Sequence, residues 1–319
     1  MLTIGVDLGG TNIKAALVDA QGKVLQQESC PTALPRSAEA ICGDVVRLCK
    51  QLMEKAHGLV AGIGVGCPGT VDPETGVVLY ANNLGWKQFP MGPFLTQRLG
   101  LPVVMGNDAN VAAFGEAMAG CAKDAQSAVI LTLGTGVGGG VVLDGRLLTG
   151  YTGAAAELGH MMIEKDGEPC TCGCRGCLET YASATALIRQ TRRAMTAHPE
   201  SLMNTLAKPD EVTGRTAFDA AFQGDAAARQ VVQEYIRYLA IGIASLINIF
   251  FPQIVGLSGG VANQGEALLE PLRRAVEPMV YGYEFTQKKT RLVCCTLGYQ
   301  AGLVGAALLA KQTIEAKQG

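Results

Sequence analysis

Apolar residues in the first 120 positions form short runs separated by glycine-rich turns, with longer segments of helical spacing between them. The runs 2–7, 60–65 and 103–105 predict buried strands. The segment 38–55 and the alanine-rich segment 109–119 predict helices. Strands that alternate with helices indicate the α/β class.

The pattern changes after residue 178, where helical spacing dominates. It predicts helices over 183–197, 216–221 and 226–251, and a final helix over about 300–316. Between them, 254–257 predicts one more strand, and the glycine pair at 259–260 predicts its turn.

Two segments of the chain resemble each other, 4–22 and 130–145. Each predicts a strand, a glycine-rich turn, a second strand and a turn that carries Asp and Gly. An internal repeat of this kind indicates two similar halves, each of which begins with a β-hairpin. We predict a small N-terminal α/β domain over 1–117, joined by the C-terminal helix 300–319, and a larger α/β domain over 118–299.

Composition narrows the possible functions. The chain has 48% hydrophobic and 5% aromatic residues, which indicates an aliphatic core. A net charge of -2 without a basic run argues against partners such as nucleic acid or an anionic membrane surface. The longest apolar stretch, 239–251, is shorter than the ~20 residues of a membrane span and predicts a buried helix. The first residues lack the features of a signal peptide, so we expect a cytoplasmic protein.

The first glycine-rich turn, Asp7-Leu8-Gly9-Gly10-Thr11, follows a strand and opens a second strand rather than a helix. That order excludes the dinucleotide-binding fingerprint, which requires a helix after the glycines. A glycine-rich hairpin can still hold phosphate, because its N–H groups can converge on an anion. Asp7 could hold Mg²⁺ through water and Thr11 could donate to a phosphate oxygen. The alternative is a tight hairpin without a ligand.

Asp108 is the candidate general base. It follows a predicted strand directly, and Asn107 and Asn110 flank it as neutral hydrogen-bonding groups. A carboxylate in this position can accept the proton of a hydroxyl group that attacks phosphorus. The alternative is that Asp108 only caps the helix from 109. Trp86, the one tryptophan, either stacks near a sugar or fills core.

Four of the eleven cysteines fall within eight residues, 170–177. With His160 they offer a Cys₃His set, which suits a tetrahedral zinc without an open position and hence a structural one. Cys174 could compete as a ligand. The remaining cysteines are expected to act as small buried apolar groups: Cys30, Cys42, Cys49, Cys67, Cys121, Cys294 and Cys295.

These motifs together resemble a known family. Residues 4–19 and 132–140 resemble the phosphate motifs of the actin/hexokinase-like ATPase superfamily, and 258–261 resembles its adenosine motif. Glu157-Leu-Gly-His160 and the cysteine run up to Glu179 resemble the ROK family (repressor, open reading frame, kinase). The segments 83–86 and 107–110 are most similar to its bacterial glucokinases.

The resemblance implies a two-domain actin/hexokinase-like (ribonuclease H-like) fold with ATP in an interdomain cleft. It implies transfer of the γ-phosphoryl group of ATP to the 6-hydroxyl of glucose, with Mg²⁺ and a structural Zn²⁺. It also implies a homodimer, since family members are often dimers. The implied ATP-binding residues are Asp7, Gly9, Gly10, Thr11, Asn12, Lys14, Gly134, Thr135, Gly136, Gly138, Gly259 and Gly260. The implied sugar-binding residues are Gly69, Asn83, Asn107, Asp108, Glu157, His160 and Glu179, and the zinc ligands are His160, Cys170, Cys172 and Cys177.

Three alternatives stay open on the sequence. Kinases for N-acetylglucosamine, N-acetylmannosamine, allose or fructose share the motifs. A sugar-responsive repressor would carry a helix-turn-helix before the first phosphate motif, which here begins at Ile4. An actin-like filament ATPase would leave the cysteine cluster without a role. We expect loss of a zinc ligand to raise KM for the sugar and to change KM for ATP much less.

Overall fold

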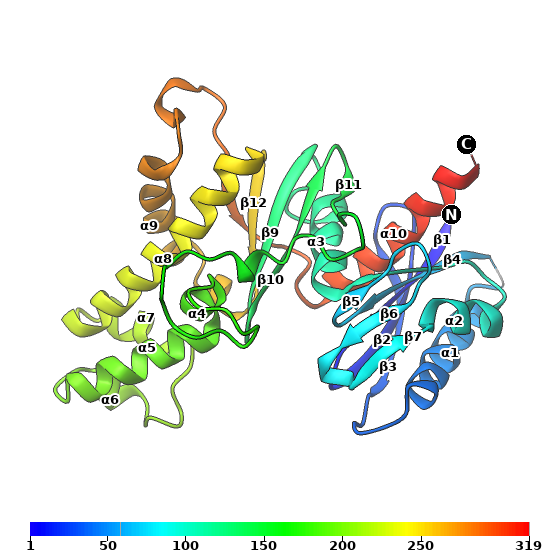
Figure 1. Ribbon diagram of the computed structural model, residues 1–319, viewed down its shortest axis with the longest axis horizontal. Helices are drawn as coiled ribbons and strands as arrows, with labels where there is room; N and C mark the ends of the chain where they lie inside the picture. Colours follow the sequence, from blue (N-terminus) through cyan, green and yellow to red (C-terminus); the bar gives the residue numbers. More distant parts are fainter. Residues whose placement is uncertain (58, 319) are drawn as a thin grey trace. The chain divides into compact units, whose positions relative to one another are not determined.

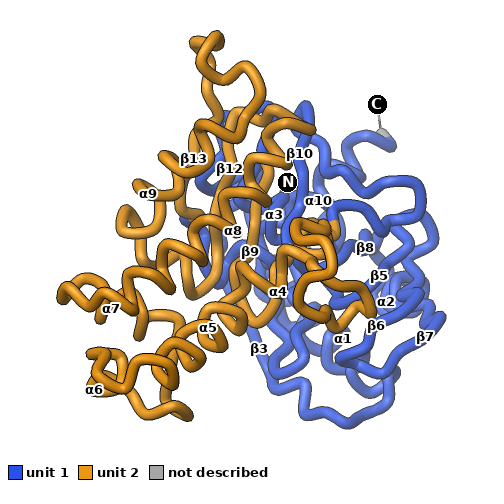
Figure 2. Tube along the Cα trace, turned by 60° about the vertical axis from the view of Figure 1, so that its left-hand side comes forward, with its two compact units in different colours: residues 1–128, 139–156, 296–319 blue, residues 129–138, 157–295 orange. Residues whose placement is uncertain are grey.

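The computed structural model describes residues 1–57 and 59–318 (Figure 1). The chain divides into two compact units (Figure 2). Unit 1 comprises Met1–Ala128, Gly139–Ala156 and Thr296–Gly319, and unit 2 comprises Val129–Gly138 and Glu157–Cys295. Unit 1 therefore includes residues 118–128, 139–156 and 296–299, which the sequence placed in the second domain. The domain assignment itself stays a prediction.

The first sheet lies in unit 1 and has the strand order β3-β2-β1-β4-β8. Its strands are β1 (Leu2–Leu8), β2 (Asn12–Val18), β3 (Val24–Pro31), β4 (Val60–Cys67) and β8 (Val103–Asn107). β1 pairs antiparallel with β2 and parallel with β4, which pairs parallel with β8. The three parallel strands end at one edge, where Asp7 is in register with Gly66, and Cys67 with Asn107.

The helices of unit 1 are α1 (Ala38–Lys55), α2 (Met91–Leu99), α3 (Asp108–Ala119) and α10 (Ala301–Gln318). In α1 the helical spacing buries one face, and the Ser37 side chain caps the helix by accepting the N–H of Ala40. α10 packs closely on the sheet, because a Cβ at Gly5 would come 1.8 Å from the Leu303 carbonyl oxygen. Only glycine permits this approach of helix to strand.

A smaller sheet in unit 1 consists of β5 (Thr70–Val71), β6 (Val78–Ala81) and β7 (Trp86–Phe89), with the 3₁₀ helix η1 (Asn82–Leu84) before β7. Trp86 is only 5% exposed, and its ring lies 5.2 Å from that of Phe89. Trp86 therefore fills core, which decides between the two roles that the sequence left open.

The second large sheet has the order β11-β10-β9-β12-β13. Its strands are β9 (Ser127–Leu133), β10 (Val137–Leu143), β11 (Arg146–Leu147), β12 (Ile254–Ser258) and β13 (Arg291–Cys294). The helices of unit 2 are α4 (Glu179–Ala182), α5 (Ala184–Ala197), α6 (Met203–Leu206), α7 (Thr216–Phe222), α8 (Ala226–Phe250) and α9 (Glu266–Val276). Short 3₁₀ turns include η2 (Leu158–His160) and η3 (Gly260–Gln264).

The longest apolar stretch of the sequence forms the second half of α8 and its end. Asp225 caps this helix by accepting the N–H of Ala228, and Phe251 ends it in the left-handed conformation, with φ 42°, before Pro252. Leu239, Ile243 and Ile247 of this stretch are fully buried, as predicted. Among the helices that the structure describes, none combines the length and the apolar character needed to cross a bilayer.

The sequence reasoning missed α2, α4, α6, α9, β3, β13 and the small sheet. Most of these elements are short, and β3 is largely polar and exposed. α2 and α9 each contain a proline, which is typical of a helix boundary rather than of a helix interior.

Candidate active site

Asp108 lies where β8 ends and α3 begins. The cap of α3 is Asn107, whose side-chain oxygen accepts the N–H of Asn110 at 3.0 Å, so capping does not depend on Asp108. The Asp108 carboxylate accepts the N–H of Ala109 at 2.8 Å. Burial raises the pKa of Asp108 above its usual value. A half-buried carboxylate with a raised pKa at a strand end has the properties of a general base.

Asp7 is a second half-buried carboxylate in unit 1, and it is in register with Lys14 on β2. Burial raises the pKa of Asp7; the Lys14 ammonium acts against this rise and the Asp108 carboxylate adds to it. Carboxylate oxygens such as those of Asp7 are ligands of the kind that Mg²⁺ prefers.

The first glycine-rich turn joins β1 to β2. The Gly9 N–H donates to the Asn12 carbonyl at 2.9 Å, while Gly10, Thr11 and Asn12 are exposed. Thr32, which is fully buried, fixes the turn: its hydroxyl donates to the Gly9 carbonyl at 2.7 Å, and its N–H donates to the Thr11 carbonyl at 2.8 Å. The sequence reasoning missed Thr32, since no motif marks a residue that follows β3.

Two of the predicted sugar-binding residues of unit 1 are in direct contact. The side-chain amide of Asn107 donates to the Gly69 carbonyl at 3.0 Å. Gly69 has φ 89°, and a Cβ there would lie 2.1 Å from the Tyr80 carbonyl oxygen, so only glycine fits. Asn83 is exposed on η1, and no hydrogen bond joins it to this pair within the described part of the chain.

The other predicted nucleotide-binding residues belong to unit 2. The second glycine-rich turn, residues 134–138, joins β9 to β10, and its Gly134 N–H donates to the Gly136 carbonyl at 3.0 Å. Gly259 has φ 92°, and a Cβ there would lie 2.3 Å from the Leu133 carbonyl oxygen. The turn at 259–260 therefore packs against the end of β9, next to residues 134–138.

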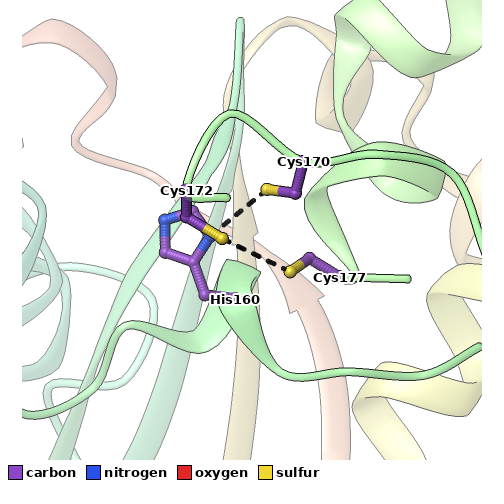
Figure 3. Close-up of side chains that lie close together, drawn as sticks. All are labelled: His160, Cys170, Cys172 and Cys177. Atoms are coloured by element: carbon purple, nitrogen blue, oxygen red, sulfur yellow. Dashed lines mark hydrogen bonds between the residues drawn. The ribbon is translucent and has the colours of Figure 1, made fainter. Parts of the chain in front are cut away.

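His160, Cys170, Cys172 and Cys177 form a cluster in unit 2 whose ligand atoms all lie within 4.8 Å of one another (Figure 3). The Cys170 sulfur is 3.7 Å from His160 Nδ1, and the Cys172 sulfur is 3.7 Å from that of Cys177. Two thiolates at about 2.3 Å from a tetrahedral zinc lie about 3.8 Å apart, so the side chains fit this ion. Cys174 lies outside this group.

Three of the cysteines predicted to be small apolar groups are buried, namely Cys42, Cys49 and Cys67. Burial raises the pKa of Cys42 and of Cys49 to about 12, so both stay protonated and unreactive. Cys30, Cys121, Cys294 and Cys295 are half-buried. For these four the expectation of full burial is wrong, because each lies at the end of an element or just beyond it.

The two glutamates that flank the cysteine run have different surroundings. Glu157 is exposed at the start of η2, and its carbonyl accepts the N–H of His160 at 3.0 Å. Glu179 begins α4, and its carboxylate accepts the N–H of Val137 at 2.9 Å. The sequence reasoning considered Glu179 only as a sugar ligand and missed this contact, because the two residues lie 42 positions apart.

Comparison with known proteins identifies the family of the chain. The sequence profile of the ROK family matches residues 3–313. This chain belongs to the ROK family. A ROK family glucokinase from Streptomyces griseus, solved in complex with glucose and AMPPNP, is 38% identical, with a TM-score of 0.80 over 98% of this chain and all of the other. The actin/hexokinase-like α/β fold class is therefore confirmed.

The ROK family contains both kinases and regulators, and the chain is similar to members of both. A glucokinase from Halalkalibacterium halodurans is 38% identical over 97% of this chain and 94% of its own length. A xylose repressor from Caldicellulosiruptor bescii is 32% identical over 90% of this chain and 72% of its own length. The higher identity and the fuller coverage favour the kinases.

Proposed function

We propose that this chain is an ATP-dependent glucokinase, which transfers the γ-phosphoryl group of ATP to the 6-hydroxyl of glucose. The observation that carries the proposal is Asp108, a half-buried carboxylate with a raised pKa. Asn107 caps the helix in its place. The likeness to a glucokinase seen with glucose and AMPPNP supports the choice of both substrates.

Asp108 accepts the proton of the sugar hydroxyl as the oxygen attacks phosphorus. In this proposal, the remaining sugar hydroxyls are hydrogen-bonded by polar groups of Gly69, Asn83, Asn107, Glu157, His160 and Glu179. His160 turns Nδ1 toward Cys170. If Nδ1 faces a metal, Nε2 carries the proton and can donate to a sugar oxygen.

The nucleotide is held by the glycine-rich turns, whose N–H groups suit phosphate oxygens. Lys14 and Thr11 add a positive charge and a hydroxyl, and Asp7 is the proposed partner of Mg²⁺. The four ligands His160, Cys170, Cys172 and Cys177 would hold a structural Zn²⁺, which supplies fixed geometry rather than chemistry.

The family resemblance also supports a cytoplasmic homodimer, and light scattering on the purified chain tests the oligomeric state. The finer choice of glucose among the hexoses rests on the glucokinase relatives.

A coupled assay of ADP release tests the function. The panel contains glucose, mannose, fructose, allose, N-acetylglucosamine, N-acetylmannosamine, 6-deoxyglucose and a control without sugar. We expect the highest kcat/KM with glucose and no transfer to 6-deoxyglucose, which lacks the acceptor oxygen. A higher kcat/KM for another sugar would reassign the substrate. Equal rates with and without sugar would indicate an actin-like ATPase, and no ADP release at all would favour a regulator.

A further inference from the structure

Three contacts join the cysteine segment, defined here as residues 157–184, to the second glycine-rich turn, and all lie in unit 2. The Val137 N–H donates to Glu179 Oε2 at 2.9 Å, and the Ala184 N–H donates to the Gly134 carbonyl at 2.9 Å. Gly159 approaches the same strand start, since a Cβ there would lie 2.0 Å from the Val137 carbonyl oxygen. The turn is thus held at both of its ends.

These contacts adjoin the metal ligands in the chain. Gly159 directly precedes His160, and Glu179 follows Cys177 by two residues. The Cys170 sulfur also lies 3.9 Å from Glu179 Oε1. One carboxylate therefore has an oxygen near a ligand and the other oxygen on the turn. A Cβ at Gly136 would lie 2.2 Å from Glu179 Oε2, so a side chain there would displace this carboxylate from the turn.

We propose that Glu179 is a positioning residue for the turn 134–138, and that filling of the Cys₃His site therefore strengthens nucleotide binding. The inference rests on the proposed function, in which this turn binds phosphate. The N–H groups of a turn can converge on an anion only if the backbone is fixed in one conformation, and Glu179 fixes the N–H of Val137. This differs from the expectation that the metal acts on the sugar much more than on ATP.

The test measures the Kd for AMPPNP with Mg²⁺ by calorimetry in the absence of sugar, so that sugar contacts do not enter. Glu179→Ala removes the acceptor of the Val137 N–H, and Kd should rise about tenfold. Glu179→Gln keeps a side-chain oxygen that can accept the N–H, and Kd should stay within about twofold of wild type. The matched control is Glu168→Ala, in the same segment, whose carboxylate pairs with Arg193 rather than with the turn.

A second measurement uses the unaltered chain and does not depend on how a variant folds. A chelator removes the zinc, and elemental analysis measures the zinc content before and after this treatment. Amide hydrogen exchange is then followed in the peptide that covers 134–138. We expect faster exchange and a higher Kd for AMPPNP after zinc is removed.

Three outcomes would overturn the inference: an unchanged AMPPNP Kd in Glu179→Ala, an equal loss in Glu179→Gln, or exchange in 134–138 that is independent of zinc. A different result would contradict the glucokinase proposal. In that case the coupled assay shows no hexose-dependent ADP release, while the AMPPNP titration still reports on the turn.

Discussion

The two glycine-rich turns arise from similar sequence segments but are held in place by different parts of the chain. The first is fixed by Thr32, which directly follows β3 in the same sheet. The second is fixed by Glu179 and Ala184, which lie more than 40 residues further along the chain, beyond the cysteines. The first turn is therefore supported by its own hairpin region, and the second by a segment that also carries a candidate metal site.

This difference shows that two turns with similar sequences can be stabilised by different interactions. If a turn is held by one buried hydroxyl, removal of that hydroxyl costs about one hydrogen bond. A turn that depends on a folded segment with a bound ion can lose its conformation when the ion is lost, because metal binding is coupled to local folding. Sugar and nucleotide affinities need not be independent in such a protein.

The largest effect is expected from Asp108→Asn, which removes the base and leaves both turns in place. Loss of a general base costs about 10²–10⁴-fold in kcat. The isosteric amide should keep the Kd for glucose and for AMPPNP near the wild-type values, which separates chemistry from phosphate binding. Asp210→Asn, an exposed site, is the control. A variant that keeps half of the wild-type kcat would remove Asp108 from the mechanism.

The pH dependence of the wild type follows from the same residue. Burial raises the pKa of Asp108, and only the ionised form can accept a proton. Activity should therefore fall as pH drops through this raised pKa and stay constant above it, until another group titrates. A kcat/KM profile against pH, recorded with and without the Asp108→Asn substitution, measures this. An acidic limb of unchanged shape in the variant would assign the limb to another residue.

The next effect compares the two turns directly, with Gly136→Ala against Gly10→Ala. A Cβ at Gly136 would lie 2.2 Å from Glu179 Oε2, whereas a Cβ at Gly10 meets no atom within 4 Å. In Gly136→Ala the Glu179 carboxylate must move away and lose the Val137 N–H, which costs about 1 kcal/mol of the free energy of unfolding. An exposed substitution without contacts changes this free energy by about 0.5 kcal/mol or less. Urea unfolding measures both. Equal losses in the two variants would mean that the turns are supported alike.

The strand ends, the glycine-rich turns and the cysteine cluster could be predicted from the sequence, because each depends on residues that are close together in the chain. The cluster needs only a histidine and three cysteines in 18 residues. The contacts of Thr32 and Glu179 could not be predicted in this way, because a single hydrogen bond to a backbone N–H or carbonyl leaves no pattern in the sequence. Asp108 was predicted as the base, but that Asn107 takes over the capping is visible only in the geometry.

A comparable effect is expected from Thr32→Val, which tests the support of the first turn. The substitution keeps the shape of the side chain and removes the hydroxyl that donates to the Gly9 carbonyl. Loss of a buried hydrogen bond should lower the free energy of unfolding by about 1–2 kcal/mol. The Kd for AMPPNP should rise and the zinc content should not change, while Thr32→Ser should retain both values. A fall in zinc content would show that the two turns are coupled.

The smallest effect is expected from Cys174→Ser, although this residue lies among the ligands. Cys174 is outside the group of four whose ligand atoms lie within 4.8 Å of one another. Its backbone carbonyl accepts the N–H of Cys170 at 2.8 Å, and serine preserves that bond. Elemental analysis should therefore give the wild-type zinc content, with unchanged KM values for glucose and ATP. Cys172→Ser, two residues earlier, removes one of the four sulfurs and should lower the zinc content below one per chain. The reverse result, with loss in Cys174→Ser and retention in Cys172→Ser, would make Cys174 the third thiolate and would require the loop between Cys170 and Cys177 to rearrange around the ion.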